Sequence, residues 1–321
     1  MKDAYKREID YLRISLTDRC QLKCQYCVPE TGIKPMPNHE LLTKEEMKEI
    51  VKTFAQLGVK KLKLTGGEPL LRSDFISIVS ELKAIEGIEE ITLTTNGIGL
   101  SFVIDDLVEA GLDGVTISLD TLDPQRYRLL TGRNQLESVL LGLERALQSK
   151  IKKIKVNCVV IKELNQDEIL KIARLAQDQR LHVRFIEWMP IGANQKFTSV
   201  SELDILNLLK ESYGFVNSFK EKLGNGPARY FEIKGFQGKI GFISALSHDF
   251  CATCNRVRLT CDGFLKPCLY YDQGVNLKEA LSKKDLESQI VSALKLKPKS
   301  HDFINQSEDG RELKSMVQIG G

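Results

Sequence analysis

The feature that most constrains the fold is a repeated alternation between short strand-like runs and amphipathic stretches with helical spacing. We expect strands at residues 10–16, 60–64, 91–94, 114–119, 154–160 and 182–187. We expect a first helix that begins with a capping box of Thr43 and Glu46, continues through the amphipathic run 47–57 and ends at Gly58. Further helices are expected at residues 74–84, 102–110, 135–148 and 167–179. Strands that alternate with helices pair in parallel through right-handed crossovers. The pattern therefore predicts an α/β protein with six βα units.

Polar residues decide between the two architectures that such units build. They follow successive strands, at Thr65–Glu68, Thr95 and Asn96, Ser118 and Asp120, and Glu187 and Met189. In a β/α barrel the carboxyl ends of all strands meet at one mouth, whereas a doubly wound sheet collects ligand residues at one switch point. Because the polar residues follow strand after strand, we expect a partial (β/α)6 TIM-like barrel.

The pattern changes after about residue 200. A helix is expected at 202–210, followed by short β-like runs at 215–219, 229–233 and 239–244, and by a helical stretch at 284–300. We therefore predict two regions: a barrel at residues 1–200, and a smaller C-terminal β-containing region at residues 201–321.

Composition excludes several classes of protein. The 321 residues are enough for a large core, and 46 Lys and Arg against 43 Asp and Glu leave a net charge of only +3. A general nucleic-acid binder usually has a larger basic excess. No apolar run reaches the ~18 residues of a membrane span, and the first residues do not resemble a signal peptide. We therefore expect a cytoplasmic protein that binds neither nucleic acid nor membranes.

Six of the eight cysteines form two trios that lie far apart in the sequence. Three lie at Cys20, Cys24 and Cys27, and three at Cys251, Cys254 and Cys268; Cys158 and Cys261 belong to neither trio. Because the cytoplasm keeps thiols reduced, these cysteines suggest metal sites rather than disulfides, and we interpret the remaining two as passive buried thiols.

Each trio is one ligand short of a closed site. Three thiolates hold three irons of a 4Fe-4S cluster and leave the fourth iron without a protein ligand. Structural zinc usually has four closed ligands, commonly in paired C-x2-C units, and so fits the first trio less well. A zinc protein with two three-cysteine sites that binds RNA remains the alternative from a different class.

Two motifs resemble a known superfamily and one family within it. The C-x3-C-x2-C trio with Tyr26 before its last cysteine, together with the run Thr65–Pro69, resembles the radical S-adenosylmethionine (SAM) superfamily. The C-x2-C-N-R-x-R-L motif from Cys251, with Cys268 and the terminal Gly-Gly, resembles its GTP 3',8-cyclase family. The resemblance extends from about Leu12 to Gly321.

The resemblance implies a lyase of molybdenum cofactor (molybdopterin) biosynthesis. Enzymes of this family convert GTP into (8S)-3',8-cyclo-7,8-dihydroguanosine 5'-triphosphate, after a 5'-deoxyadenosyl radical from SAM abstracts hydrogen from C3' of GTP. Two 4Fe-4S clusters and SAM are the implied cofactors. A different radical SAM enzyme, whose second cluster binds a peptide, stays open as an alternative.

The resemblance also implies roles for individual residues. All six trio cysteines are implied cluster ligands: Cys20, Cys24, Cys27, Cys251, Cys254 and Cys268. The implied SAM contacts are Tyr26, Gly66, Gly67, Glu68, Ser118 and Met189. The implied GTP contacts are Arg13, Lys63, Thr94, Lys155, Arg184, Arg256 and Arg258, of which Arg13, Arg256 and Arg258 are also the implied catalytic residues. A triphosphate of about −4 needs several fixed cations, which we expect where the strands end.

Partners follow from the same resemblance. It implies GTP as substrate, a reductant such as flavodoxin or ferredoxin, and the next enzyme of the pathway, cyclic pyranopterin monophosphate synthase. It also implies that the Gly320-Gly321 tail reaches into the active site. The sequence leaves open whether the protein is a monomer or a homodimer, and none of the four histidines is assigned a role.

Overall fold

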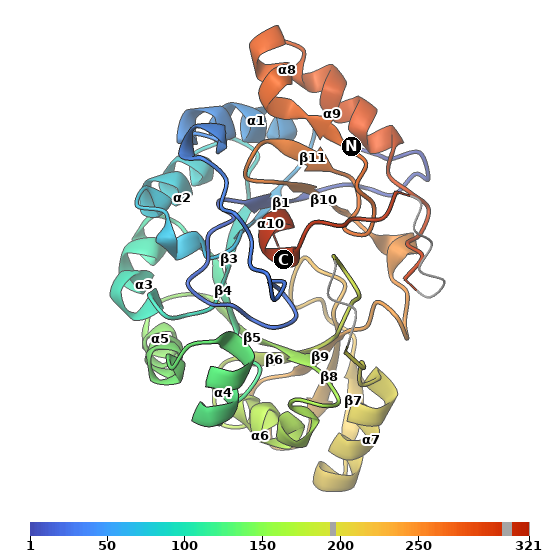
Figure 1. The fold of residues 1–321 in the computed structure, drawn as a ribbon. Coiled ribbons are helices and arrows are strands. Elements are labelled where there is room, and N and C mark those ends of the chain that lie inside the picture. Colours follow the sequence, from blue (N-terminus) through green and yellow to red (C-terminus); the bar gives the residue numbers. More distant parts are fainter. Residues whose placement is uncertain (193–196, 304–309, 321) are drawn as a thin grey trace.

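A computed structural model describes residues 1–192, 197–303 and 310–320. Its strands form one curved sheet in the order β12-β11-β10-β1-β2-β3-β4-β5-β6-β9-β8-β7 (Figure 1). The strands are β1 (Tyr11–Ser15), β2 (Lys61–Thr65), β3 (Glu90–Thr95), β4 (Gly114–Ser118), β5 (Lys153–Val160), β6 (His182–Glu187), β7 (Val216–Phe219), β8 (Arg229–Ile233), β9 (Ile240–Ile243), β10 (Arg256–Leu259), β11 (Phe264–Lys266) and β12 (Val275–Asn276).

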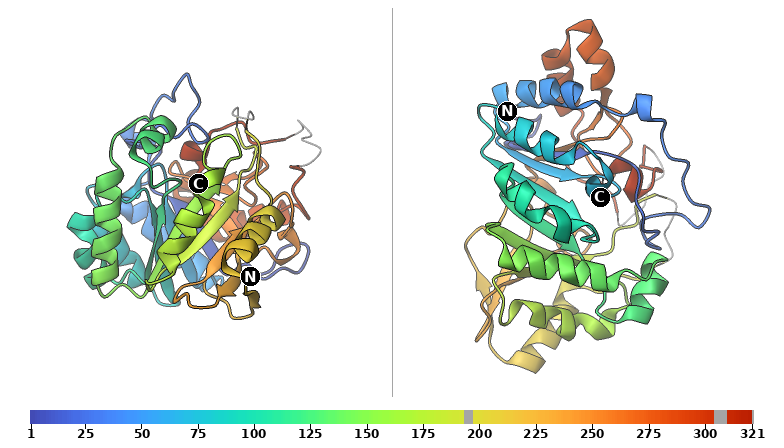
Figure 2. Two further views of the ribbon diagram at one scale, coloured as in Figure 1. Left: turned by 90° about the horizontal axis from the view of Figure 1, so that it is seen from below. Right: turned by 90° about the vertical axis from the view of Figure 1, so that its left-hand side faces the viewer.

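Most helices cover the outer, convex side of this sheet (Figures 1 and 2). The helices are α1 (Lys44–Gln56), α2 (Phe75–Lys83), α3 (Leu100–Glu109), α4 (Pro124–Thr131), α5 (Leu136–Gln148), α6 (Ile169–Ala173), α7 (Glu202–Tyr213), α8 (Leu277–Lys283), α9 (Leu286–Lys295) and α10 (Met316–Ile319). The short α10 is the exception, because it lies on the inner side of the curve, close to the C-terminus (Figure 1).

The strand order confirms the predicted barrel type. Strands β1 to β6 lie in the order in which they occur in the chain, and every neighbouring pair among them is parallel. A doubly wound sheet would reverse its strand order at a switch point, and these six strands do not. The carboxyl ends of the six strands therefore lie along one rim of a partial barrel.

The C-terminal strands extend the barrel sheet at both edges. Strand β10 pairs in parallel with β1, and β9 pairs in parallel with β6. The predicted boundary near residue 200 is therefore not a break in the sheet, and the division into two regions stays a prediction. Because β10 pairs with β1, the second cysteine trio, which flanks β10 and β11, lies beside the first strand of the barrel.

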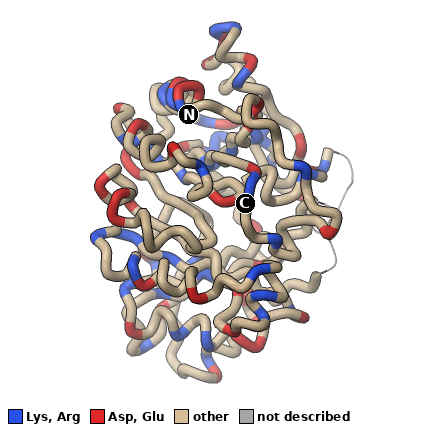
Figure 3. Tube along the Cα trace, turned by 60° about the vertical axis from the view of Figure 1, so that its left-hand side comes forward, with Lys and Arg blue, Asp and Glu red and all other residues tan. Residues whose placement is uncertain are grey.

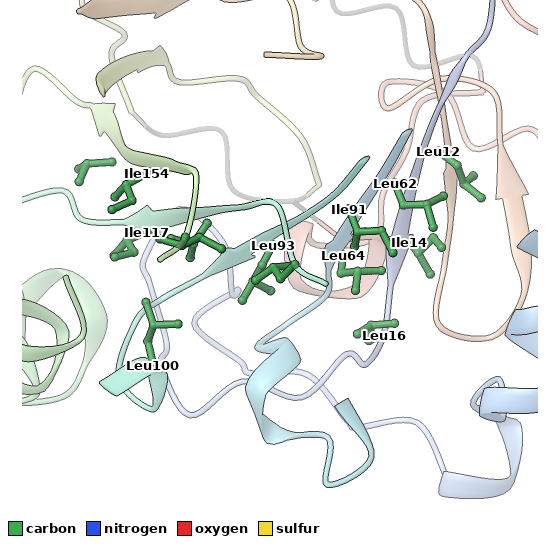
Figure 4. Packing of buried hydrophobic residues seen from close by; sticks show 14 of the residues in the cluster. Leu12, Ile14, Leu16, Leu62, Leu64, Ile91, Leu93, Leu100, Ile117 and Ile154 are labelled. Atoms are coloured by element: carbon green, nitrogen blue, oxygen red, sulfur yellow. The ribbon is translucent and has the colours of Figure 1, made fainter. Parts of the chain in front are cut away.

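Each barrel strand separates an apolar outer face from a polar inner face. The outward-facing Leu12, Ile14, Leu62 and Leu64 are fully buried and pack with residues of the neighbouring strands and helices (Figure 4). The residues between them point to the inside of the curve, as Arg13 does in β1. Because successive side chains of a strand alternate between the two faces, this pattern leaves polar groups around the barrel axis.

Helix α4 was not expected from the sequence, although its ends carry clear signals. The Asp123 carboxylate accepts a hydrogen bond from the Arg126 backbone N–H at 2.7 Å, and Pro124 occupies the first turn. Gly132 ends the helix in the left-handed conformation, with φ of 70°. The helix is short and contains few apolar residues, so the sequence showed no helical spacing of apolar residues there.

Two predicted helices are shorter or interrupted. The expected helix at 167–179 is reduced to α6 between two 3-10 turns, Gln166–Glu168 and Arg174–Ala176. The buried carboxylate of Glu168 there accepts hydrogen bonds from Thr121 and the Leu122 backbone, contacts that local periodicity does not show. The expected helix at 284–300 is α9, which Lys284 separates from α8 by a φ of 55°.

The described part of the chain carries positive and negative residues on all its segments. Residues of both signs are interspersed along the chain, as the small net charge predicts (Figure 3). In the part of the chain that the structure describes, every helix is too short or too polar to cross a bilayer.

Candidate active site

The inward-facing residues of the barrel surround a cavity of about 340 Å³. Its wall includes residues from all six parallel barrel strands and from β10. All six cysteines of the two trios line this one cavity. A TIM barrel is normally filled by layers of packed side chains, so a cavity with polar walls indicates a binding site within the barrel.

The glycine-rich run after β2 packs against the segment that leads to the first trio. A Cβ atom on Gly66 would lie 2.6 Å from the carbonyl oxygen of Thr17, and one on Gly67 would overlap the carbonyl of Arg19. The Gly67 N–H donates to the Thr17 carbonyl at 2.6 Å. These glycines are therefore required for the close approach of two backbones, and this approach places the cysteine loop beside the β2 end.

Glu68 of the same run serves as a brace for the loop after β3. Its buried carboxylate accepts hydrogen bonds from Thr95 Oγ1 and the Asn96 backbone N–H, both at 2.7 Å, and from the Leu70 backbone N–H at 3.0 Å. Burial raises the pKa of Glu68 to about 7. Glu68 does not line the cavity, in contrast to the other residues that the sequence assigns to SAM binding.

The thiols of the first trio share a buried position after β1. Burial raises the pKa of Cys20 to about 11 and that of Cys27 to about 12, and burial together with the charge of Cys27 raises the pKa of Cys24. The Asn96 side-chain amide donates to Cys20 Sγ at 3.9 Å. Such thiols lose their protons when they bind a metal, so the trio is suited to a metal cluster and not to nucleophilic chemistry.

Asp120 connects the first trio to the β4 and β5 ends. The Tyr26 hydroxyl donates to Asp120 Oδ2 at 2.5 Å, and the Val159 backbone N–H donates to Oδ1 at 2.8 Å. Asp120 also lines the cavity. The structure thereby explains the orientation of Tyr26, which the sequence assigned to SAM binding without a partner.

The second trio lies beside β10 and β11. Cys251 and Cys254 precede β10, and Cys268 follows β11. Burial raises the pKa of Cys251 to about 12. For Cys254 burial also raises the pKa, but the charges of Arg256 and Lys297 outweigh it and lower the value to about 6. Cys254 is therefore readily deprotonated, as metal ligation requires.

The spread of the sulfur atoms argues against a single zinc ion in either trio. Four thiolates around one zinc ion, each at ~2.3 Å, lie about 3.8 Å apart. Among the described residues, only Asp249, Cys251 and His301 form a group of three whose ligand atoms all lie within 4.8 Å of one another. The two cysteine trios are wider than this, as ligands to separate irons of one cluster must be.

A row of cations crosses the cavity wall at one level of the sheet. Arg13 is in register with Arg258 on one side and with Lys63 on the other. Lys155 and Arg184 extend from the opposite side of the barrel, in β5 and β6. The structure therefore corrects our expectation that these cations gather where the strands end, because they lie within the strands, below the rim.

Among the described residues, the hydrogen-bond partners of Lys63 and Arg184 are neutral groups. Lys63 Nζ donates to Thr116 Oγ1 at 3.1 Å, and Arg184 donates to Asn157 Oδ1 at 2.8 Å and to the same Thr116 at 3.2 Å. Burial, and then the charges of Arg184 and Arg13, lower the pKa of Lys63 well below its usual value. Burial likewise lowers the pKa of Arg258. Because these partners are neutral and the cations repel one another, this part of the wall is suited to bind a multiply charged anion.

The C-terminal segment enters the same cavity. Arg258 Nη1 donates to the Gly320 carbonyl at 2.7 Å. Ile319 is fully buried in a small apolar cluster with Tyr270 and Phe303. The tail therefore reaches the cation row as the sequence implied; Gly321 lies outside the described residues.

The structure brings nearly all the residues assigned from the sequence to one cavity. The lining includes Arg13, Tyr26, Lys63, Gly66, Gly67, Thr94, Ser118, Lys155, Arg184, Met189, Arg256 and Arg258, besides the six trio cysteines. Their roles stay predictions. The lining also includes residues to which the sequence analysis assigned no role, among them Asn96, Asp120, Lys297 and His301. Asn96 and Asp120 follow predicted strands and were recognised as polar strand ends, whereas nothing near Lys297 or His301 in the sequence signals a site.

Two protein families match the chain over most of its length. The family described as "Radical SAM superfamily" matches residues 14–176, and the one described as "Molybdenum Cofactor Synthesis C" matches residues 181–303. A GTP 3',8-cyclase of Clostridium perfringens (strain 13 / Type A) is 43% identical over 325 residues, and one of Moorella thermoacetica is 43% identical over 328 residues. Both alignments cover 100% of this chain and of the relative.

Solved structures support the fold independently. Streptococcus suis SuiB bound to S-adenosylmethionine superimposes with a TM-score of 0.59 at 16% identity, covering 97% of this chain and 77% of SuiB. The structure of SuiB bound to its precursor peptide SuiA gives the same TM-score at 15% identity. At this identity the likeness concerns the fold, and it agrees with the partial barrel.

Proposed function

This chain belongs to the GTP 3',8-cyclase family of radical SAM enzymes, and from that premise we propose how its own residues carry out the reaction. The enzyme converts GTP into (8S)-3',8-cyclo-7,8-dihydroguanosine 5'-triphosphate, an early step of molybdenum cofactor biosynthesis, while SAM is consumed to methionine and 5'-deoxyadenosine. The observation that carries the proposal is that two cysteine trios and a row of buried cations line a single cavity.

The two trios divide the work between SAM and GTP. When bound, a reduced 4Fe-4S cluster at Cys20, Cys24 and Cys27 supplies the electron that splits SAM into methionine and a 5'-deoxyadenosyl radical. Cys251, Cys254 and Cys268 would hold a second 4Fe-4S cluster, which would supply a binding position for the guanine base of GTP. The donor sets fit these groups, because each offers three spread thiols and leaves one position open to a ligand.

Residues around the first trio hold SAM. Tyr26, fixed by Asp120, and Met189 contact SAM, and Ser118 is positioned by β4 on the cavity wall. The backbone at Gly66 and Gly67 meets the amino group of SAM. Glu68 acts through this loop as a positioning residue, since its carboxylate is occupied by three internal hydrogen bonds.

The buried cations hold the triphosphate. Lys63, Lys155 and Arg184 lie on the same inner wall, and each is less than 10% exposed. Burial in this wall makes each charge–phosphate contact stronger than at the surface, because solvent screens it less. Thr94 contacts the sugar from β3. Together they place C3' of GTP within reach of the radical and exclude water from it.

Three arginines serve the later part of the reaction. Arg13 and Arg258 are register neighbours, and Arg256 follows Cys254 by two residues. They provide positive charge next to the base when the cyclised nucleotide is reduced after attack on C8. Arg258 also holds the Gly320 carbonyl, so the tail and the arginine act in the same place.

The partners and location complete the proposal. The first cluster needs a one-electron reductant, such as flavodoxin or ferredoxin, and the product passes to cyclic pyranopterin monophosphate synthase. Because six ligating cysteines require a reducing compartment, we place the enzyme in the cytoplasm.

The experiment that tests the proposal combines metal analysis with turnover. Protein purified without oxygen should contain about eight irons and about eight sulfides, as two 4Fe-4S clusters require. With SAM, a reductant and GTP it should form the cyclised nucleotide, and ATP should not replace GTP. A colourless protein loaded with zinc would refute the proposal, and turnover of a peptide instead of GTP would point to a different radical SAM reaction.

The pH dependence of GTP binding should report on Lys155. Burial, and then the charge of Arg184, lower the pKa of Lys155 to about 7, and a bound triphosphate raises that pKa again. GTP affinity is therefore fully present below pH 7 and decreases above it, by up to about tenfold per pH unit. Calorimetric titration of GTP between pH 6 and 9 measures this effect.

Lys155→Gln provides the comparison, because subtracting its curve removes the ionisation of GTP itself. Lys153→Gln is the matched control, since Lys153 lies on the same face of β5 but pairs with Glu90 at 2.7 Å. Parallel curves for the wild type and Lys155→Gln would contradict the assignment of Lys155.

Gly320→Ala should displace the tail from the cation row. Gly320 has a φ of 76°, and a Cβ atom there would lie only 2.8 Å from Ser15 Cβ. We expect product formation to fall about 10²-fold, because a displacement of about 1 Å costs that much in a positioned site. Quantification of the cyclised nucleotide measures it. Gly214→Ala, with a φ of 74° and open space around the Cβ position, is the control for backbone strain alone.

A further inference from the structure

We propose that Lys297 is a positioning residue of the second cysteine trio: its ammonium group binds the Cys254 sulfur and makes an iron-sulfur cluster at this trio easier to reduce. The inference rests on the proposed function, because it takes Cys251, Cys254 and Cys268 as cluster ligands. Lys297 lies just after α9, outside every motif that the sequence indicated.

The contacts of Lys297 account for all its donors. Its Nζ lies 3.4 Å from Cys254 Sγ, 2.9 Å from the Arg256 carbonyl oxygen and 2.7 Å from the Pro267 carbonyl oxygen. An ammonium group has three N–H donors, so each of these acceptors takes one. A single side chain therefore connects the Cys254 segment to the residue that directly precedes Cys268.

The burial of Lys297 requires a negative partner. The residue is only 3% exposed, and a charge removed from water is costly unless it is paired. Two of its three acceptors are neutral carbonyls, and its hydrogen bonds among the described residues include no carboxylate. The third acceptor is the Cys254 sulfur, which is negative as a thiolate. A metal-bound thiolate is thus the group that justifies this buried charge.

A second cation fixes the segment that carries Lys297. Arg7 donates to the Cys251 carbonyl at 2.8 Å, and also to the carbonyls of Pro298 at 2.6 Å and Lys299 at 3.0 Å. Arg7 is in turn held by Asp3 at 2.5 Å. The segment after α9 is therefore bound to both ends of the Cys251–Cys254 loop, which keeps Nζ directed at the sulfur.

The consequence is a difference in reduction potential. Reduction by one electron adds negative charge to a cluster and its sulfur ligands, so a cation that donates to a ligating sulfur favours the reduced form. In the first trio the donors to Cys20 are neutral: the Asn96 side-chain amide at 3.9 Å and the Leu22 backbone. Lys297 should therefore raise the potential at the second trio and leave the first unchanged.

The test is Lys297→Met in the complete holoenzyme, which keeps the volume of the side chain and removes its charge and donors. Redox titration followed by electron paramagnetic resonance separates the clusters, because added GTP changes only the signal of the second. We expect the equilibrium constant for reduction of the second cluster to fall about tenfold. For one electron this corresponds to a reduction potential about 59 mV more negative. Lys295→Met, at an exposed position in α9, should leave both potentials unchanged.

Each outcome bears on the proposal. Wild-type protein without a GTP-sensitive second signal would refute the proposed function before any variant is made. With that signal present, a Lys297→Met protein of full iron content and unchanged potential would overturn only the role of Lys297. If the variant instead loses the iron of the second cluster, Lys297→Arg, which retains a cation with donors, should restore it, and failure of this rescue would overturn the proposal as well.

Discussion

Replacing Cys24 with alanine should abolish SAM cleavage, with a loss of at least about 10³-fold. Cys24 is the central ligand of the first trio, and burial together with Cys27 already raises its pKa, which marks the three thiols as one closely coupled group. Two remaining thiolates do not retain a cluster with an open iron, so electron transfer to SAM has no site. Anaerobic assays that quantify 5'-deoxyadenosine, with dithionite as reductant, measure the effect.

Cys158→Ala is the matched control for this substitution. Cys158 is buried in the main apolar core, its thiol donates to the Asp120 carbonyl, and it does not line the cavity. This control should retain SAM cleavage and its iron. Appreciable 5'-deoxyadenosine from Cys24→Ala, at a level close to that of the control, would exclude the first trio as the site of SAM cleavage.

Replacing Cys268 with alanine should separate SAM cleavage from product formation. Cys268 belongs to the second trio and follows β11 on the cavity wall. The variant should still form some 5'-deoxyadenosine, uncoupled from GTP, while the cyclised nucleotide falls by at least about 10²-fold because the base is no longer held in place.

Cys261→Ala is the control here, because Cys261 is buried near β10 and belongs to neither trio. Both products should be measured in the same reaction by mass spectrometry. Equal loss of 5'-deoxyadenosine in Cys24→Ala and Cys268→Ala would contradict the division of labour between the trios.

The sequence predicted the local elements well where burial dictates them. The six strands appear within one or two residues of the expected bounds, and the helix after Thr43 begins with the capping box that Thr43 and Glu46 form. Prediction failed at the expected helix 167–179 and at α4, where hydrogen bonds to distant loops or short, weakly apolar segments decide the outcome.

The candidate site was predictable to the extent that its residues lie in local motifs. The cysteine trios and Gly66-Gly67 are visible in the sequence because ligand spacing and backbone approach are properties of a few consecutive residues. Glu68 shows the limit of this reasoning, since its carboxylate braces the loop after β3 and does not line the cavity.

The sequence alone determined three things: six parallel strands, two incomplete sets of thiolate ligands, and the family to which the chain belongs. The tertiary structure decided that both sets line one cavity, that Arg13 stands between Lys63 and Arg258, and that Lys297 reaches Cys254. The reason is physical: the register between β1 and β10, and the packing of the segment after α9, join residues far apart in the chain, and no local pattern of apolar or charged residues specifies such pairs.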